Sequence, residues 1–242
     1  IPLLSADIKR LKQGDGSWQL LDEKNQLVIE AETLVIANAY GCEQFEQTKF
    51  LPVTQLRGQI SLLSTSEASI GLKTVICGEG YITPAQNSTH NCGATYNKGL
   101  FTTALREEDH CANIEQMSAT DNGLGNALGP QNTASMGGRA NYRCTTKDYL
   151  PIVGPVPYVP SFLKDYDALR HDARKLVPTL GSYQPNLYVH CGMGSRGLCY
   201  APLTAEILAA DIAGEVPPLE RELRLAMHPA RFLIRDLKKK RI

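Results

Sequence analysis

A glycine-rich loop near the carboxyl end of the chain limits the possible folds more than any other feature. It reads Gly192-Met193-Gly194-Ser195-Arg196-Gly197, follows a strand-like run over residues 186–190 and precedes a helix-like run over residues 202–213. The order strand, G-x-G-x-x-G, helix is the dinucleotide-binding fingerprint, in which amides at the helix start meet a pyrophosphate. Such a fingerprint opens a βαβ unit and is followed by further strands, whereas a proline-containing stretch and a basic tail follow this loop. The letters alone leave two interpretations open: a loop that binds another part of a ligand, and a tight turn without a ligand.

The first 41 residues have the pattern of an α/β domain. They begin as a β-meander, with strands expected at 18–22 and 26–30. The run over residues 33–41 is continuously apolar and then turns to small residues, which is typical of a fully buried strand in a parallel sheet. The small residues at its carboxyl end would let a bulky ligand approach the backbone; they are Ala37, Ala39 and Gly41.

The middle of the chain has the pattern of an antiparallel sheet instead. Short strands are expected at residues 59–63, 74–77, 80–84, 91–96 and 135–142. The connections expected there are a polar helix at 107–118, a Gly- and Asn-rich loop at 122–132, an irregular proline-rich segment at 147–159 and a short helix at 165–176. We therefore expect a mixed α/β and α+β fold. A domain formed by residues 1–50 and 161–242 would be split by an inserted antiparallel-sheet domain, residues 51–160.

Composition excludes several classes of protein. Lys plus Arg and Asp plus Glu each number 25, so overall charge does not indicate nucleic-acid binding, and any such surface must be local. The seven cysteines are scattered without a C-x-x-C pair, which argues against a disulfide framework or a zinc site and favours a reducing cytoplasm. The five histidines have no ligand spacing, so no metal site is expected. No run is long and apolar enough to cross a bilayer, and no membrane partner is expected.

The carboxyl terminus is locally basic. The positive residues there are Arg221, Arg224, Arg231, Arg235 and the run Lys238-Lys239-Lys240-Arg241. One interpretation is contact with RNA phosphates, which would be salt-dependent and independent of sequence. The other is a solvated helix end with a frayed tail, which the residues alone favour.

Several motifs in a fixed order resemble a known family. They are residues 37–41, Leu51–Gln59, Gly80–Pro84, Arg143–Gly154 and the glycine loop. This order resembles the D-amino-acid oxidase (glycine oxidase-like) superfamily of FAD enzymes over essentially all 242 residues. More narrowly, residues 52–59, 138–154 and 229–233 are similar to the C-terminal FAD-dependent oxidoreductase part of bacterial bifunctional enzymes of tRNA wobble-uridine modification, whose other part is a methyltransferase.

The chain departs from that superfamily at its amino end. Members begin with a G-x-G-x-x-G that binds the FAD pyrophosphate, and Gly14-Asp15-Gly16 in a polar turn is no substitute. The resemblance therefore implies an incomplete FAD-binding, Rossmann-like domain with an inserted substrate domain. We expect a fragment of a longer, multifunctional polypeptide that lacks the N-terminal flavin-binding and methyltransferase parts, with FAD binding impaired or lost.

The resemblance also implies a reaction and a set of site residues. The cofactor would be FAD, and the substrate a 5-carboxymethylaminomethyl-uridine in the tRNA anticodon loop. Its carboxylate would meet Arg143 and Arg196, with Tyr81 facing the flavin and Arg139 a weaker candidate. The expected cofactor-binding residues are Ala37, Ala39, Gly41, Arg57, Gly58, Gln59, Gly192, Met193, Gly194, Ser195, Arg196, Gly197 and Leu198.

Plainer interpretations of these residues stay open. An isolated arginine often forms a surface salt bridge, a tyrosine on a strand often only packs, and residues 57–59 also fit an ordinary turn. At the level of function, the alternatives are a small-molecule oxidase of the amino-acid, glycine or sarcosine type, and a non-catalytic RNA-binding fragment. Flavin content would separate the last of these from an enzyme.

Overall fold

The computed structural model describes residues 2–242 and divides them into two compact units. Unit 1 combines the chain up to Thr54 with Cys144–Ile242, and unit 2 is Gln55–Arg143. An inserted unit inside a split one was expected, and the chain divides in that order. The expected boundary after residue 160 lies inside unit 1, because the strand at 152–157 pairs with another unit 1 strand.

Unit 1 begins with the expected meander. Strands β1 (Arg10–Gln13), β2 (Trp18–Leu21) and β3 (Leu27–Ala31) form an antiparallel sheet in that order. The Trp18 ring is buried, and its Nε1 donates a 2.8 Å hydrogen bond to the Pro185 carbonyl. This bond ties the meander to the second sheet of the same unit.

Both segments that were predicted to bind a ligand, residues 37–41 and the glycine loop, follow strands of the second sheet of unit 1. Its order is β11 (Ile152–Pro157), β12 (Tyr183–Cys191) and β4 (Leu34–Ile36), with β4 parallel to β12. The expectation of a fully buried strand was wrong, because within residues 2–242 β4 is an edge strand next to β12 and leaves Val35 exposed. The prediction of an irregular segment at 147–159 was also wrong, because residues 152–157 form strand β11. Its prolines are compatible with β11 because this is an edge strand with a bulge between Pro155 and Pro157.

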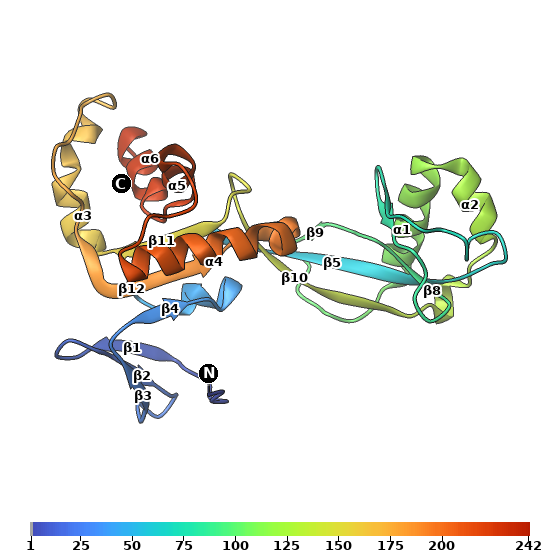
Figure 1. The fold of residues 1–242 in the computed structure, drawn as a ribbon, viewed down its shortest axis with the longest axis horizontal. Helices are drawn as coiled ribbons and strands as arrows, with labels where there is room; N and C mark the ends of the chain where they lie inside the picture. Colours follow the sequence, from blue (N-terminus) through green and yellow to red (C-terminus); the bar gives the residue numbers. More distant parts are fainter. Residues whose placement is uncertain (1) are drawn as a thin grey trace. The chain divides into compact units, whose positions relative to one another are not determined.

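Helices complete unit 1. Helix α4 (Gly197–Ala213) packs along β11 and β12 (Figure 1). Helix α3 (Val159–Asp165) ends where the sequence predicted a helix to begin, because Pro160 suits a first helical turn; a 3-10 turn at 167–170 follows. The carboxyl-terminal segment, which was expected to be a frayed tail, instead forms helices α5 (Arg221–Met227) and α6 (Arg231–Lys238). Helix α6 is held in place because Phe232, Leu233 and Leu237 are buried.

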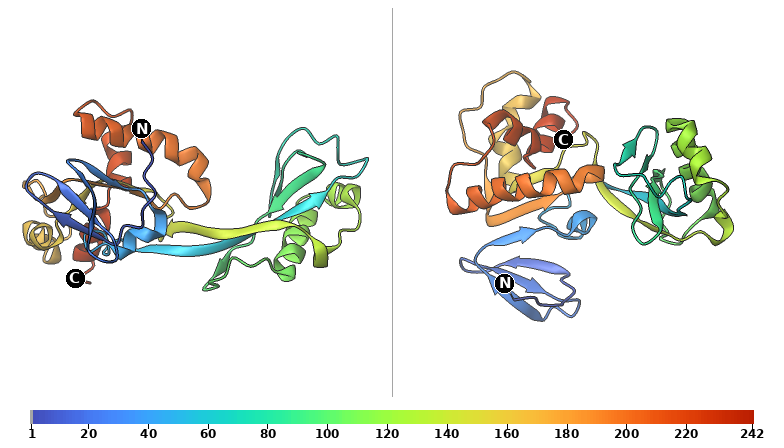
Figure 2. Two further views of the ribbon diagram at one scale, coloured as in Figure 1. Left: turned by 90° about the horizontal axis from the view of Figure 1, so that it is seen from below. Right: turned by 45° about the vertical axis from the view of Figure 1, so that its right-hand side comes forward.

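Unit 2 is a sheet covered by two helices. Its strand order is β10 (Gly138–Thr146), β5 (Val53–Ser64), β8 (Thr89–Gly93), β7 (Tyr81–Ile82) and β6 (Ile76–Cys77), with β9 (Asn97–Lys98) also on β5. Helix α1 (Glu107–Thr120), which was expected, packs against β7 and β8, as the two views of Figure 2 show in green. Helix α2 (Asn122–Leu128) lies where a loop was expected. The Asp121 side chain caps it at the Leu124 amide, 3.0 Å away, and Leu124 and Leu128 are buried.

Candidate functional site

The two segments expected to contact a cofactor meet at one edge of the unit 1 sheet. Leu34 pairs with Leu187 and Ile36 with Val189 in parallel, so the carboxyl ends of β4 and β12 reach the same edge. Ligands bind at this edge in open α/β sheets. Residues 37–41 leave β4 there and enter a 3-10 turn (Ala39–Gln44), and the glycine loop leaves β12. The sulfurs of Cys42 and Cys191 lie 3.9 Å apart between the two segments.

Glycine is required at two positions of the loop. Gly192 and Gly194 have φ angles of +72° and +59°, a left-handed conformation that side chains rarely adopt. A Cβ at Gly192 would also lie 3.0 Å from the Thr146 methyl carbon. Gly197, by contrast, has helical backbone and opens α4. The loop therefore brings its backbone close to whatever lies at the sheet edge.

The start of α4 suits an electron-rich ligand. The side chain of the N-cap residue Arg196 does not cap this 17-residue helix, and the first turn of the helix holds no acidic residue. The amides there and the positive end of the helix dipole favour negative charge. Ser195, Arg196 and Leu198 are exposed beside these amides, Leu198 by 96%, while Met193 is half-buried.

Ala37 and Asn38 line a pocket of about 320 Å³ together with β4, and its other walls come from the amino-terminal segment, the meander and residues 44–45, not from the glycine loop. Ala37 and Ala39 are exposed, and a Cβ at Gly41 would lie 2.8 Å from the Asn38 side-chain nitrogen. These small residues and the loop fit the ring end of a flavin. Gly14-Asp15-Gly16 lies in the turn between β1 and β2 and precedes no helix, so it does not fit a pyrophosphate.

A second group of predicted residues comes together in unit 2 around Arg143. Its Nη1 donates a 3.2 Å hydrogen bond to the Thr95 carbonyl, and its guanidinium carbon lies 4.5 Å from the centre of the Tyr96 ring. A Cβ at Gly58 would lie only 1.8 Å from Nη1. The Arg143 guanidinium therefore packs directly against Gly58, in the space that a side chain at this position would fill, and we call Gly58 its seat.

Tyr81 belongs to the same group. It lies on β7 opposite Gly93, and its hydroxyl would be 3.3 Å from a Cβ at that glycine. Burial raises the pKa of Tyr81, and the charges of Arg143 and Arg139 only partly offset the rise. The phenol is thus a hydrogen-bond donor at neutral pH, and with the guanidinium it suits a carboxylate.

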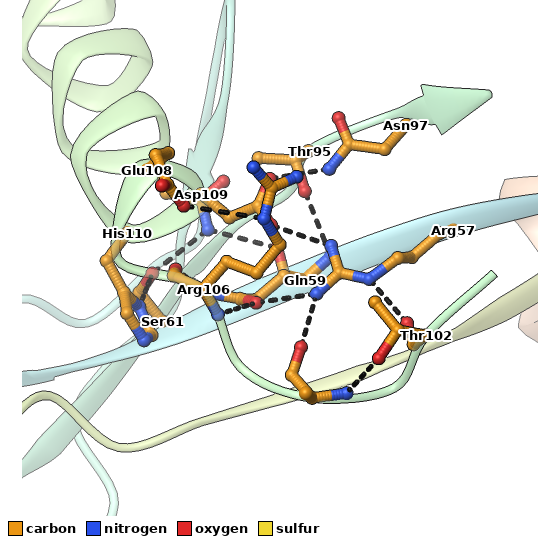
Figure 3. A network of polar contacts seen from close by, with 12 residues as sticks. Arg57, Gln59, Ser61, Thr95, Asn97, Thr102, Arg106, Glu108, Asp109 and His110 are labelled. Atoms are coloured by element: carbon orange, nitrogen blue, oxygen red, sulfur yellow. Dashed lines mark hydrogen bonds and ion pairs between the residues drawn. The ribbon is translucent and has the colours of Figure 1, made fainter. Parts of the chain in front are cut away.

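Arg57 and Gln59, which were expected to contact the cofactor, lie in a buried network of polar contacts. Arg57 is fully buried and pairs through Nη1 with the Asp109 carboxylate at 2.7 Å (Figure 3). It also donates to the Thr102 and Ala104 carbonyls and to Gln59 Oε1, and Gln59 in turn donates to the Arg106 carbonyl. The two side chains therefore join β5 to the start of α1.

The charge of Asp109 is maintained in this network. Burial alone would raise its pKa, but hydrogen bonds from Asn97 and Arg57 and the Arg57 charge outweigh that effect. The pKa of Asp109 therefore lies below its ordinary value. Ser61 and His110 extend the network with a 2.7 Å contact, also seen in Figure 3.

The predicted arginines belong to different units. Arg143, with Tyr81, lies in unit 2, as does the exposed Arg139, whereas Arg196 lies in unit 1 with the glycine loop. Sequence reasoning did not identify Thr95 and Tyr96, which position Arg143. It also did not predict that Cys42, Cys144 and Cys191 cluster beneath the loop, because no sequence spacing links them. Hydrogen bonds to Cys144 and Cys42, together with burial, raise the pKa of Cys191.

Within residues 2–242, we find no helix with the length and apolar character needed to cross a membrane. Comparison with known families gives a match to the model described as FAD dependent oxidoreductase (DAO) over residues 4–211. This confirms the resemblance inferred from the ordered motifs.

Similar curated proteins share one description. The chain is 40% identical over 241 residues to the tRNA 5-methylaminomethyl-2-thiouridine biosynthesis bifunctional protein MnmC of Saccharophagus degradans, covering 99% of this chain and 34% of that protein. It is 39% identical over 226 residues to the protein of the same name from Chromobacterium violaceum, covering 93% and 34%. The chain thus spans about a third of the length of these curated relatives.

Solved structures share the fold at low identity. Glycine oxidase from Geobacillus kaustophilus superposes with a TM-score of 0.66 at 16% identity, covering 93% of this chain and 52% of that one. Iminodiacetate oxidase from Chelativorans gives 0.63 at 19% identity, covering 88% and 51%.

Proposed function

The chain belongs to the FAD dependent oxidoreductase (DAO) family, and on that basis we propose that it forms the flavin-ring and substrate-binding part of a tRNA-modifying oxidoreductase. The reaction would remove the carboxymethyl group from 5-carboxymethylaminomethyl-(2-thio)uridine at the wobble position. The MnmC relatives, whose names specify biosynthesis of 5-methylaminomethyl-2-thiouridine in tRNA, support this substrate class. Such a substrate would place the protein in the cytoplasm, where its seven free cysteines stay reduced.

One observation carries the proposal: the glycine loop meets residues 37–41 at the carboxyl edge of β4 and β12. FAD, when bound, would supply the hydride acceptor for the carbon next to the substrate nitrogen. The left-handed Gly192 and Gly194 let the loop backbone approach the ring, and the start of α4 favours the negative charge that a reduced ring carries. With FAD bound, the loop would therefore stabilise the reduced ring more than the oxidised one.

The unit 2 group would bind the substrate carboxylate. The Arg143 guanidinium is fixed by Thr95, Tyr96 and the Gly58 seat, and the Tyr81 phenol adds a neutral donor. A neutral secondary amine needs no dedicated base to lose hydride, so these residues bind and orient the substrate. Water then hydrolyses the substrate imine, which releases a glyoxylate-like fragment and leaves the aminomethyl base.

A second candidate is a small-molecule amine oxidase, since the Arg143 and Tyr81 group would suit the carboxylate of a free amino acid equally well. Turnover decides between the two. In the longer polypeptide loaded with FAD, tRNA carrying the carboxymethylaminomethyl group should be converted, while glycine and sarcosine are not. Conversion of the free amino acids alone would refute the tRNA proposal.

Arg143 provides the residue-level test. Arg143→Ala should raise the KM for the tRNA substrate and leave FAD affinity unchanged, whereas Arg139→Ala on the same strand should change neither strongly. Unchanged kinetics in Arg143→Ala would remove Arg143 from the site.

A further inference from the structure

A pocket of about 460 Å³ lies in unit 1 among α3, α5, α6 and the start of β12, and we call it the C-terminal pocket. Figure 1 shows α3, in yellow, and α5 and α6, in red, around the carboxyl terminus. Its walls include Phe162, Tyr166, Tyr183, His228 and Ile234, and none of the glycine-loop residues lines it. The proposed oxidation reaction does not use this pocket.

The pocket has an aromatic wall with fixed geometry. The Phe162 and Tyr166 rings are stacked 4.5 Å apart at an interplanar angle of 10°. The Tyr183 ring meets Phe162 edge-on at 6.0 Å and His228 at 5.6 Å, and 37% of Tyr183 is exposed. The wall is also uncharged at neutral pH. Burial raises the pKa of Tyr183 to about 12 and, with help from nearby arginine charges, lowers the pKa of His228 to about 4.

The rim of the pocket is basic and held in place. Lys238 and Lys239 line it and are exposed. The backbone amides of Lys239 and Lys240 bond to the carbonyls of Arg235 and Leu237, and the Arg170 side chain donates a 2.8 Å bond to the Ile242 carbonyl. The positive run after α6 therefore has defined positions.

Only part of this positive charge is neutralised. Arg231 and Arg235 both pair with Asp148, at 3.0 and 3.5 Å, and Arg241 lies 3.5 Å from Asp236. Within residues 2–242, Lys238 and Lys239 form no ion pair. An uncharged aromatic wall under unneutralised lysines complements a group that is planar on one side and anionic on the other.

A nucleotide has that composition. We propose that the C-terminal pocket seats an unpaired nucleotide of an RNA, with the base against Tyr183 and the phosphate against Lys238 and Lys239. Aromatic rings accept the face of any base, and lysines contact phosphates without reading sequence. The inference rests on the proposed tRNA substrate and adds a contact outside the oxidation site. An acidic protein segment fits the lysines but makes no use of the flat aromatic wall.

The test measures how tightly the 242-residue chain binds a labelled anticodon stem-loop RNA. Binding is monitored by the fluorescence anisotropy of the RNA over a range of salt concentrations. Tyr183→Ala should weaken binding at least about fivefold, and Tyr183→Phe should retain it because the ring is kept. The double variant Lys238→Glu/Lys239→Glu should weaken binding and reduce the slope of log Kd against log salt by about 1 to 2. The matched control Lys24→Glu/Lys73→Glu changes two exposed lysines elsewhere and should bind like the parent.

Binding that is absent in the parent chain, or unchanged in both Tyr183→Ala and the lysine double variant, would overturn the proposal. The proposal would also be overturned if a glutamate-rich peptide displaced the RNA and bound to Tyr183→Ala as tightly as to the parent chain. That result would identify a protein as the partner. The lysine variant is on the surface and keeps the test valid if Tyr183→Ala misfolds. The chain could bind RNA with the expected pattern while the FAD-loaded longer polypeptide does not convert tRNA. That outcome would refute the proposed reaction and support the nucleotide site in the C-terminal pocket.

Discussion

The seat of Arg143 on Gly58 predicts a strong coupling between the two residues. In Gly58→Ala the new methyl group would start 1.8 Å from Arg143 Nη1, so the guanidinium must withdraw by about 1.6 Å to reach ordinary contact at 3.4 Å. That movement breaks the 3.2 Å hydrogen bond to the Thr95 carbonyl and shifts the cation off the Tyr96 ring. Because Arg143 is only half-buried, we expect the hydrogen bond to contribute about 0.5–1 kcal/mol and the ring contact about as much.

Gly58→Ala should therefore lower the free energy of unfolding by about 1–2 kcal/mol, with Arg143 displaced rather than the fold lost. In an Arg143→Ala background the same substitution meets no guanidinium and should be nearly neutral, or slightly stabilising through the unfolded state. Urea unfolding of the parent, the two single variants and the double variant measures this coupling without any cofactor. An equal cost for Gly58→Ala in both backgrounds would refute the seating of Arg143 on Gly58.

Three further outcomes follow from the structure. Gly192→Ala should cost about 1–3 kcal/mol of stability, because its φ is +72° and Thr146 crowds the Cβ, whereas Gly197→Ala should be tolerated; thermal melts compare the two. Asp109→Asn should cost about 3 kcal/mol or more by leaving buried Arg57 unpaired, while Glu108→Gln in an exposed pair should cost under about 1 kcal/mol. Because the folded-state pKa of Asp109 is lowered, its contribution is complete above the unfolded pKa and should be lost as pH falls below about 4. Urea melts across pH should show a larger loss in the parent than in Asp109→Asn, in which the lowered pKa of Asp148 still contributes.

The change of hydrophobic pattern along the chain predicted the split architecture. The family resemblance, not the pattern, placed residues 37–41 and the glycine loop together as cofactor-binding residues, and the parallel pairing of β4 with β12 brings them to one sheet edge. It did not predict α2, since Gly123 and Gly125 lower helix propensity and the burial of Leu124 and Leu128 overrides that preference. It did not predict β11 either, because an edge strand tolerates prolines that a central strand excludes.

Within the candidate site, the motif over residues 57–59 shows that neighbouring residues of one motif can have different contacts. Successive side chains of a strand point to opposite faces. Arg57 and Gln59 therefore enter the buried network with Asp109, while Gly58 faces Arg143. The contacts of Arg143 with Thr95 and Tyr96 join distant positions of the chain and leave no sequence signal.

The most direct test of the central claim is a titration of the chain with lumiflavin, the flavin ring without ribityl or phosphate groups. The ring site should quench the fluorescence of lumiflavin in the parent and in Gly197→Ala, and ADP should not compete, because a ring site needs no pyrophosphate cradle. Gly192→Ala should lose the quenching through its strained loop. No quenching in the parent, or equal quenching in folded Gly192→Ala, would contradict a flavin-ring site at the glycine loop.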